Sequence, residues 1–93
     1  MAWCTDMEKE KLRNEIALID QEVIGLVSRR TSLAERIGRM KMSEGLPIKD
    51  PAVEAKVIAR YRSYAEMEGL DPEDGERLAK LLIEIAIKKE TQR

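Results

Sequence analysis

A long series of apolar residues in the first half of the chain is the feature that most constrains the fold. Its members recur at alternating intervals of four and three residues, and only Arg30 breaks the series. We call this series the apolar ladder: Leu12, Ile16, Ile19, Val23, Leu26, Leu33, Ile37 and Met40. Heptad spacing without an internal proline predicts one helix, from about residue 7 to 42, with a stripe that packs against another helix.

Turn signals close this first helix and open a second one. Gly45 suits the left-handed position after a helix, and Pro47 excludes the residue before it from helical space. Asp50 and Pro51 then have the residue types of an N-cap and a first helical position. The sequence therefore predicts a second helix over about 51–68.

The same signals recur further along the chain. Gly69 indicates a helix end, and Asp71-Pro72 repeats the N-cap pair and predicts a third helix that ends near Thr91. The stretch "LAKLLIEIAIKK" in this helix is apolar on most sides, which predicts that the helix is well buried. Because no segment has the alternating pattern of a strand, the predicted class is all-α.

The length of the first helix predicts an oligomer. A helix of about 35 residues is about 50 Å long, which exceeds the size of a compact domain of 93 residues. Two shorter helices cannot cover the whole apolar ladder. We therefore predict three helices per chain, one long and two shorter, in an intertwined homodimer whose long helices pair.

Composition excludes several classes of function. Charged residues make up 38% of the chain but nearly cancel, which argues against a general binder of nucleic acid or anionic membranes. The chain has no histidine, so histidine catalysis and histidine–metal sites are excluded. A lone cysteine (Cys4), the lack of a membrane-spanning apolar run and a start unlike a signal peptide predict a cytoplasmic protein.

Two cations of the first helix are candidates for an anion site. Arg30 stands where the apolar ladder needs an apolar residue, so it either pairs with an acid at the helix seam or binds an anionic ligand. Lys41 follows 11 residues later, which places it on nearly the same side of the helix and about 16 Å further along. Two long cationic side chains at this spacing could bracket a small dianion.

Arg13 cannot share a small ligand with Lys41 inside one chain. The two lie 28 residues apart, which corresponds to about 42 Å along a helix. Arg13 is therefore either a surface charge or part of a site that a partner chain completes.

Three acids complete the candidate residues. Asp50 is explained as an N-cap, and Glu54 in the first turn of the second helix favours the helix dipole. Glu90 lies near the end of the third helix, where a negative charge opposes the dipole. Local violations of this kind tend to occur at functional sites.

The ordered series of these residues resembles a known family. The segments "LRNEIALIDQEVIGLVSRRTSLAERIGRMK" and "LPIKDP", followed by Glu54, resemble the all-helical class of chorismate mutase over about residues 10–92. The resemblance implies an intertwined dimer that converts chorismate to prephenate in aromatic amino-acid synthesis, a pericyclic Claisen rearrangement that needs no cofactor or metal. It implies a chorismate mutase domain over 9–93, after an N-terminal extension over 1–8.

The resemblance also assigns roles to individual residues. It implies four catalytic charges: Lys41 and Glu90 at the ether oxygen of the substrate, and Arg30 with the partner chain's Arg13 at the carboxylates. It implies six substrate-binding residues: Asp50 and Glu54 at the ring hydroxyl, and Ile37, Ile83, Ala86 and Ile87 along the walls.

Three positions depart from the family's pattern. Val53 stands where many relatives have an arginine, and Ala86 replaces a small polar residue. Glu90 replaces a glutamine, so it can donate to the ether oxygen only when it is protonated. Burial would raise the pKa of Glu90 and Lys41 would lower it, and the sequence leaves the balance open.

Two other functions stay open at this point. Isochorismate pyruvate lyase activity uses the same fold, although Asp50 and Glu54 suit the hydroxyl of chorismate better. A non-catalytic helical dimer that binds a regulatory partner is the alternative outside the enzymes, and association with another enzyme of the pathway is also open.

Overall fold

The computed structural model describes the backbone of residues 2–92 and the side chains of residues 6–92. These residues form three α-helices and no strand: α1 (Ala2–Ser43), α2 (Pro51–Met67) and α3 (Pro72–Thr91). The predicted all-α class, with one long and two shorter helices, is confirmed.

The start of α1 differs from the sequence-based expectation. The helix begins at Ala2 instead of about residue 7, because residues 2–6 contain neither glycine nor proline to stop it. No break in the helix separates residues 8 and 9, so the division into an extension and a domain stays a prediction. The side chains of Trp3 and Cys4 lie outside the described residues.

The two predicted N-caps are confirmed. The Asp50 carboxylate accepts hydrogen bonds from the main-chain N–H groups of Ala52 and Val53, at 3.2 and 3.3 Å. The Asp71 carboxylate accepts one from the N–H of Glu73 at 2.9 Å. Each cap satisfies N–H groups that have no partner inside the helix.

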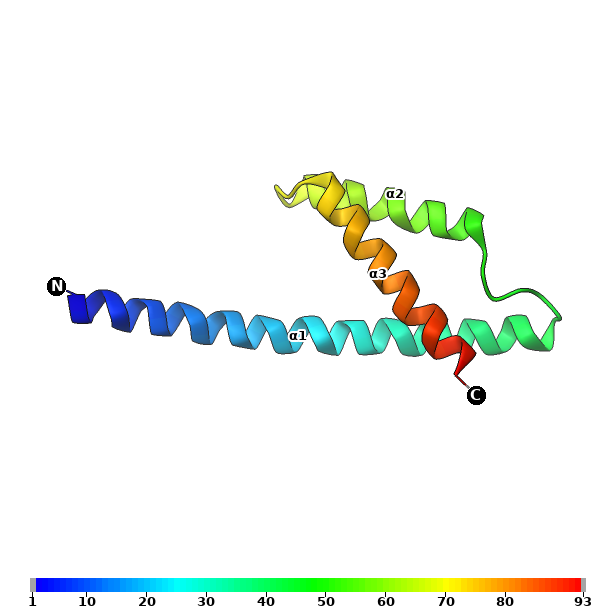
Figure 1. The fold of residues 1–93 in the computed structure, drawn as a ribbon, viewed down its shortest axis with the longest axis horizontal. Coiled ribbons are helices and arrows are strands. Elements are labelled where there is room, and N and C mark those ends of the chain that lie inside the picture. Colours follow the sequence, from blue (N-terminus) through cyan, green and yellow to red (C-terminus); the bar gives the residue numbers. More distant parts are fainter. Residues whose placement is uncertain (1, 93) are drawn as a thin grey trace.

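The glycines that end α1 and α2 also behave as predicted. Gly45 and Gly69 have φ angles of 72° and 75°, in the left-handed region that favours glycine. In each case the next residue, Leu46 or Leu70, donates its N–H to a carbonyl in the last turn of the helix at 2.8 Å. These bonds turn the chain back, so that α2 and α3 fold over the C-terminal half of α1 (Figure 1).

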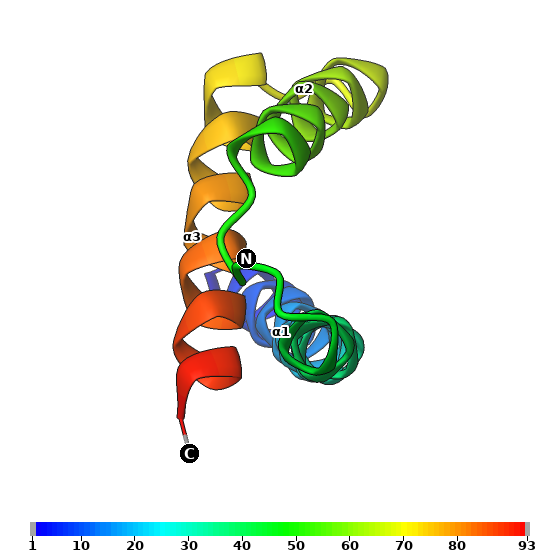
Figure 2. The ribbon, with the colours of Figure 1, turned by 90° about the vertical axis from the view of Figure 1, so that its right-hand side faces the viewer.

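Helix α3 connects the other two helices. It packs against α2 near its own start and against α1 near its end, whereas α1 and α2 do not pack together. Figure 2 shows α1 and α2 separated in the end view, with α3 running past both. Among the described side chains, the buried apolar ones lie on α2 and α3: Val57, Ala65, Ala79, Leu82 and Ala86.

The single chain is extended and has a small core. Its radius of gyration is 17.9 Å, whereas a compact domain of this length has a value of about 12 Å. The residues of the apolar ladder are 49–61% exposed, and the N-terminal half of α1 projects beyond α2 and α3 (Figure 1). Helix α3 is also less buried than expected, because Leu78 and Leu81 point away from its two neighbours and are about half exposed.

We expect Gly75→Ala to destabilise the chain. At the α2–α3 crossing, a Cβ on Gly75 would lie 2.9 Å from the Cβ of Ala65 and would also overlap the carbonyl of Tyr61. Because main chain cannot rotate away as a side chain can, overpacking of this kind costs about 1–3 kcal/mol. Thermal or denaturant unfolding measures the loss.

The matched control is Gly25→Ala in α1, where nothing lies within 4 Å of an added Cβ. This variant should unfold at or above the midpoint of the parent, since alanine is the better helix former. A Gly75→Ala variant as stable as the parent would contradict the close crossing.

Candidate active site

A pocket opens where the three helices converge. It has a volume of about 360 Å³ and lies between the C-terminal half of α1, the α1–α2 loop, the first half of α2 and the last half of α3. This volume falls in the range that holds a small organic molecule. Most of its wall is apolar, with charged side chains from all three helices.

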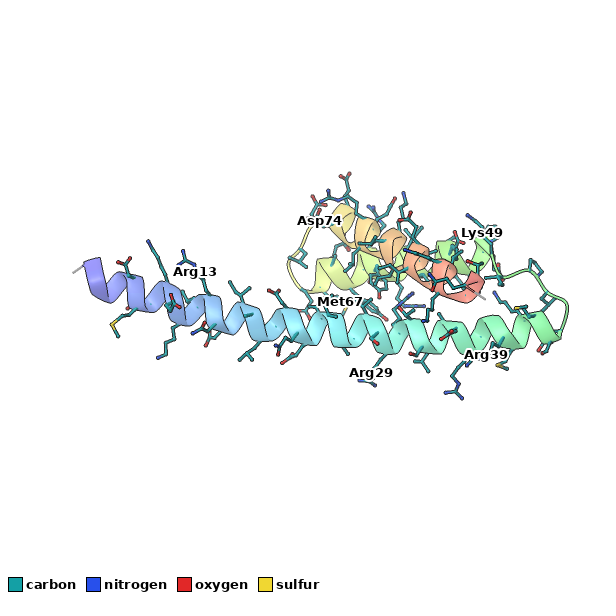
Figure 3. The ribbon with its side chains drawn as sticks, turned by 60° about the horizontal axis from the view of Figure 1, so that its bottom comes forward. Arg13, Arg29, Arg39, Lys49, Met67 and Asp74 are labelled. Carbon is teal, nitrogen blue, oxygen red and sulfur yellow. The ribbon has the colours of Figure 1, made fainter. Side chains whose placement is uncertain are left out.

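The pocket unites all but one of the predicted site residues. Those that line it are Arg30, Ile37, Lys41, Asp50, Glu54, Ile83, Ala86, Ile87 and Glu90. Arg13 is the exception: it lies on the projecting N-terminal half of α1, far from α2 and α3 (Figure 3). Within one chain, Arg13 therefore belongs to no shared site with the others.

Helical periodicity explains how α1 presents its residues to the pocket. Arg30, Ala34, Ile37 and Lys41 follow one another by four, three and four residues, so they lie on one face of the helix. The neighbouring Arg29 points away from α2 and α3 (Figure 3). The position of Arg30 on the pocket face thus follows from its place in the helical repeat.

Lys41 is held in place by the loop that follows α1. Its Nζ donates a hydrogen bond to the carbonyl of Ile48 at 3.2 Å. An ammonium group has three protons to donate, so this bond leaves two for other partners. The side chain is half-buried, and Ile48 itself lines the pocket.

The two acids at the start of α2 differ in the hydrogen bonds that their carboxylates make. The Asp50 carboxylate is engaged in capping α2, whereas Oε2 of Glu54 is buried and has no hydrogen-bond partner among the described residues. A buried acceptor without a donor costs free energy, so it favours a ligand that brings one. The pocket therefore suits a ligand with a hydroxyl or another donor near Glu54.

Glu90 reaches the pocket from the last turns of α3. Burial raises the pKa of its carboxyl, and the nearby Lys41 offsets part of that increase. The sequence left open whether burial or Lys41 has the larger effect on this pKa. In the structure burial has the larger effect, so the neutral form of Glu90 is favoured more than in a free glutamate.

Sequence reasoning missed two cations of the pocket. Lys56 and Arg60 line it from α2, three and seven residues after Val53, so they lie on the same face of the helix as that residue. The regular spacing from Val53 could have indicated both.

The charges of the pocket favour a small anion. The pocket has four cations and three acids, so its cations exceed its anions by one even when all three acids are charged. Cationic forks and ammonium groups beside apolar walls suit an organic dicarboxylate.

The residues that the structure describes contain neither a metal-binding cluster nor a membrane-spanning helix. No three cysteine, aspartate or glutamate side chains come together there in a way that could hold a metal ion. None of the described helices combines the length and apolarity needed to cross a membrane.

Comparison with known proteins identifies the family. The model of chorismate mutase type II matches residues 12–91. The chorismate mutase of Methanocaldococcus jannaschii is 31% identical over 74 residues, which cover 80% of this chain and 75% of that protein. The intracellular chorismate mutase of Mycobacterium tuberculosis is 37% identical over 78 residues, which cover 84% of this chain and 68% of that protein.

A third relative is much longer. The T-protein of Enterobacter agglomerans is 35% identical over 66 residues, which cover 71% of this chain but only 18% of that protein. The family model covers α1 from Leu12 onward and all of α2 and α3. The chain belongs to the chorismate mutase type II family.

Proposed function

We propose that this chain is a chorismate mutase, an isomerase that converts chorismate to prephenate. The observation that carries the proposal is the pocket itself, in which three helices bring Arg30, Lys41, Glu54 and Glu90 together. The family and the names of the relatives support the same activity.

The reaction requires the protein only to position the substrate and to place charged groups beside it. The rearrangement breaks an ether C–O bond and forms a C–C bond within one molecule, so no atom or proton passes to the protein. Catalysis then rests on holding the substrate folded and on stabilising the negative charge that grows on the ether oxygen. A pocket without a nucleophile or a histidine can do both.

The charged residues divide this work. Arg30 binds a substrate carboxylate through its guanidinium fork. Lys41 donates to the ether oxygen with a proton that its bond to Ile48 leaves free. Glu54 accepts the ring hydroxyl, which gives its unpaired Oε2 a donor, and the main chain of Asp50 assists there.

The apolar walls keep water away from the reacting atoms. Ile37, Ile83, Ala86 and Ile87 line this part of the pocket. Exclusion of water strengthens the interaction of Lys41 with the ether oxygen, because the local dielectric constant falls.

Glu90 is the second donor to the ether oxygen and acts in its neutral form. A carboxylic acid can donate a hydrogen bond, whereas a carboxylate can only accept one. Its raised pKa keeps more of the neutral form at a given pH. Activity is therefore highest below the pKa of Glu90 and declines as the pH rises through it.

The active form is an intertwined homodimer in which Arg13 of one chain completes the pocket of its partner. The exposed apolar ladder and the radius of gyration of 17.9 Å support this assembly, since a chain alone leaves its longest stripe unpaired. Arg13 lies far from the pocket of its own chain, and antiparallel pairing of the long helices would bring it towards the pocket of the partner (Figure 3).

The protein acts in the cytoplasm, within the synthesis of phenylalanine and tyrosine. The name of the mycobacterial relative, intracellular chorismate mutase, supports this location. The reducing cytoplasm also suits a chain whose sequence has a single cysteine.

The loss of chorismate, followed by absorbance, tests the activity directly. We expect turnover by the parent and a fall of about 10²–10³-fold in kcat/KM for Arg30→Ala and Lys41→Ala, because each removes a charge aimed at the substrate. Arg29→Ala is the matched control, since Arg29 points away from the pocket (Figure 3). Circular dichroism checks that every variant folds.

Near-parent turnover in Arg30→Ala or Lys41→Ala would overturn the site assignment. A parent that leaves chorismate unchanged but releases pyruvate from isochorismate would favour the lyase. A parent inactive on both substrates, and not stabilised by a transition-state analogue, would favour a binding module.

Mixing two inactive variants tests the shared site. We expect Arg13→Ala and Arg30→Ala each to be inactive alone. After unfolding and refolding together, they should recover about a quarter of the parent activity, because half of the random dimers contain one unaltered pocket. Steady-state kinetics measure the recovery.

A mixture of Arg30→Ala and Lys41→Ala is the control. Both residues belong to the pocket of their own chain, so no unaltered pocket forms and no activity should return. Arg13→Ala with full activity by itself would refute the role of Arg13.

The pH dependence tests the role of Glu90. We expect kcat/KM of the parent to decline towards alkaline pH and that of Glu90→Gln to stay level, since an amide donates at every pH. Glu84→Gln, an exposed position of α3, is the control and should keep the decline. Identical profiles for the parent and Glu90→Gln would exclude a protonated Glu90.

A further inference from the structure

The side chain of Glu90 in α3 packs against a glycine of α1. Gly38 is buried, and a Cβ placed on it would lie 2.9 Å from both Cγ and Oε2 of Glu90 and 3.2 Å from its Cβ. All three of the nearest atoms belong to this one side chain. The Glu90 side chain thus occupies the space that any other residue at position 38 would fill.

A glycine at position 38 makes the helix less stable, and its contact with Glu90 explains why a glycine stands there. Glycine inside a helix is less favourable than alanine by about 1 kcal/mol, and Gly38 lies well inside α1. It lies three residues before Lys41, on the side of the helix that α3 crosses. A methyl group there would push Glu90 off α1, because both Cβ and Cγ would have to move.

We propose that Gly38 is a positioning residue: its missing side chain lets the Glu90 carboxyl lie against the backbone of α1, partly shielded from water and near Lys41. The inference rests on the proposed function, because Glu90 matters to catalysis as a neutral donor. Burial is the larger influence on the Glu90 carboxyl, and the packing against Gly38 supplies part of that burial.

The effect of Gly38 can be separated from the effects of charge. The charged groups that share the pocket with Glu90 lie on α1 and on the loop and first half of α2: Arg30, Lys41, Asp50, Glu54, Lys56 and Arg60. Only Lys41 shifts the pKa of Glu90 by its charge. A change of Gly38 to alanine leaves all of these charges in the chain and alters the space for Glu90.

The test compares Gly38→Ala with the parent in two measurements. We expect the alkaline decline of kcat/KM to move to lower pH by about one unit, because a carboxyl displaced towards water ionises more readily. The pKa of Glu90, measured by carboxyl ¹³C NMR, should fall by a similar amount. Gly25→Ala, in open space on the same helix, should change neither.

Two double variants complete the design. Gly38→Ala in the Glu90→Gln background should leave the level pH profile unchanged. Gly38→Ala in the Glu90→Ala background should cost little in Tm, because the overlapping Cγ and carboxylate are gone. If Gly38→Ala unfolds in the parent background, the Glu90→Ala background still tests the contact between Gly38 and Glu90. An equal loss of Tm in both backgrounds would refute that contact.

The outcomes distinguish the two proposals. An active parent whose Glu90 pKa and pH profile are unchanged by Gly38→Ala overturns the positioning role but leaves the mutase activity standing. An inactive parent overturns the proposed function, and the NMR titration then still decides whether Gly38 sets the state of Glu90.

Discussion

The packing of α3 against both other helices is the contact on which the rest of the structure depends. Helices α1 and α2 do not pack together, so their spacing depends on α3 and on the loop that joins them, and the pocket lies in the space between the three helices. Small residues make these crossings close: Gly75 against α2 and Gly38 against α3. The geometry of the site therefore depends on these two glycines, which have no side chain, as much as on the side chains that line the pocket.

The same arrangement leaves the chain incomplete by itself. Helix α3 covers part of one side of α1, and the apolar ladder stays about half exposed along its whole length. Apolar area of this extent is rarely left in water by a monomer, which supports the proposed pairing of long helices. The projecting half of α1 also bears Arg13, so the proposed assembly and the proposed role of Arg13 depend on each other (Figure 3).

The electrostatics of the pocket follow from unequal burial of its acids. Asp50 is engaged as a helix cap, Glu54 has a buried oxygen without a donor, and the pKa of Glu90 is raised by burial against the pull of Lys41. Three carboxyl groups in one pocket are thus in three different states. These differences fit the proposed roles, in which Glu54 accepts a hydrogen bond from the ring hydroxyl and a neutral Glu90 donates one.

Local physics in the sequence determined the three helices, both N-caps, both glycine turns and the face on which Arg30 and Lys41 lie, because these depend on periodicity and on neighbours a few residues away. The start of α1 was misplaced, since the apolar ladder begins later than the helix that carries it. Only the tertiary structure showed that Lys56 and Arg60 line the pocket and that Glu90 packs against Gly38. It also showed that the pKa of Glu90 is raised. Those features depend on burial and on contacts between helices far apart in the chain, and such contacts exist only after α3 has crossed α1.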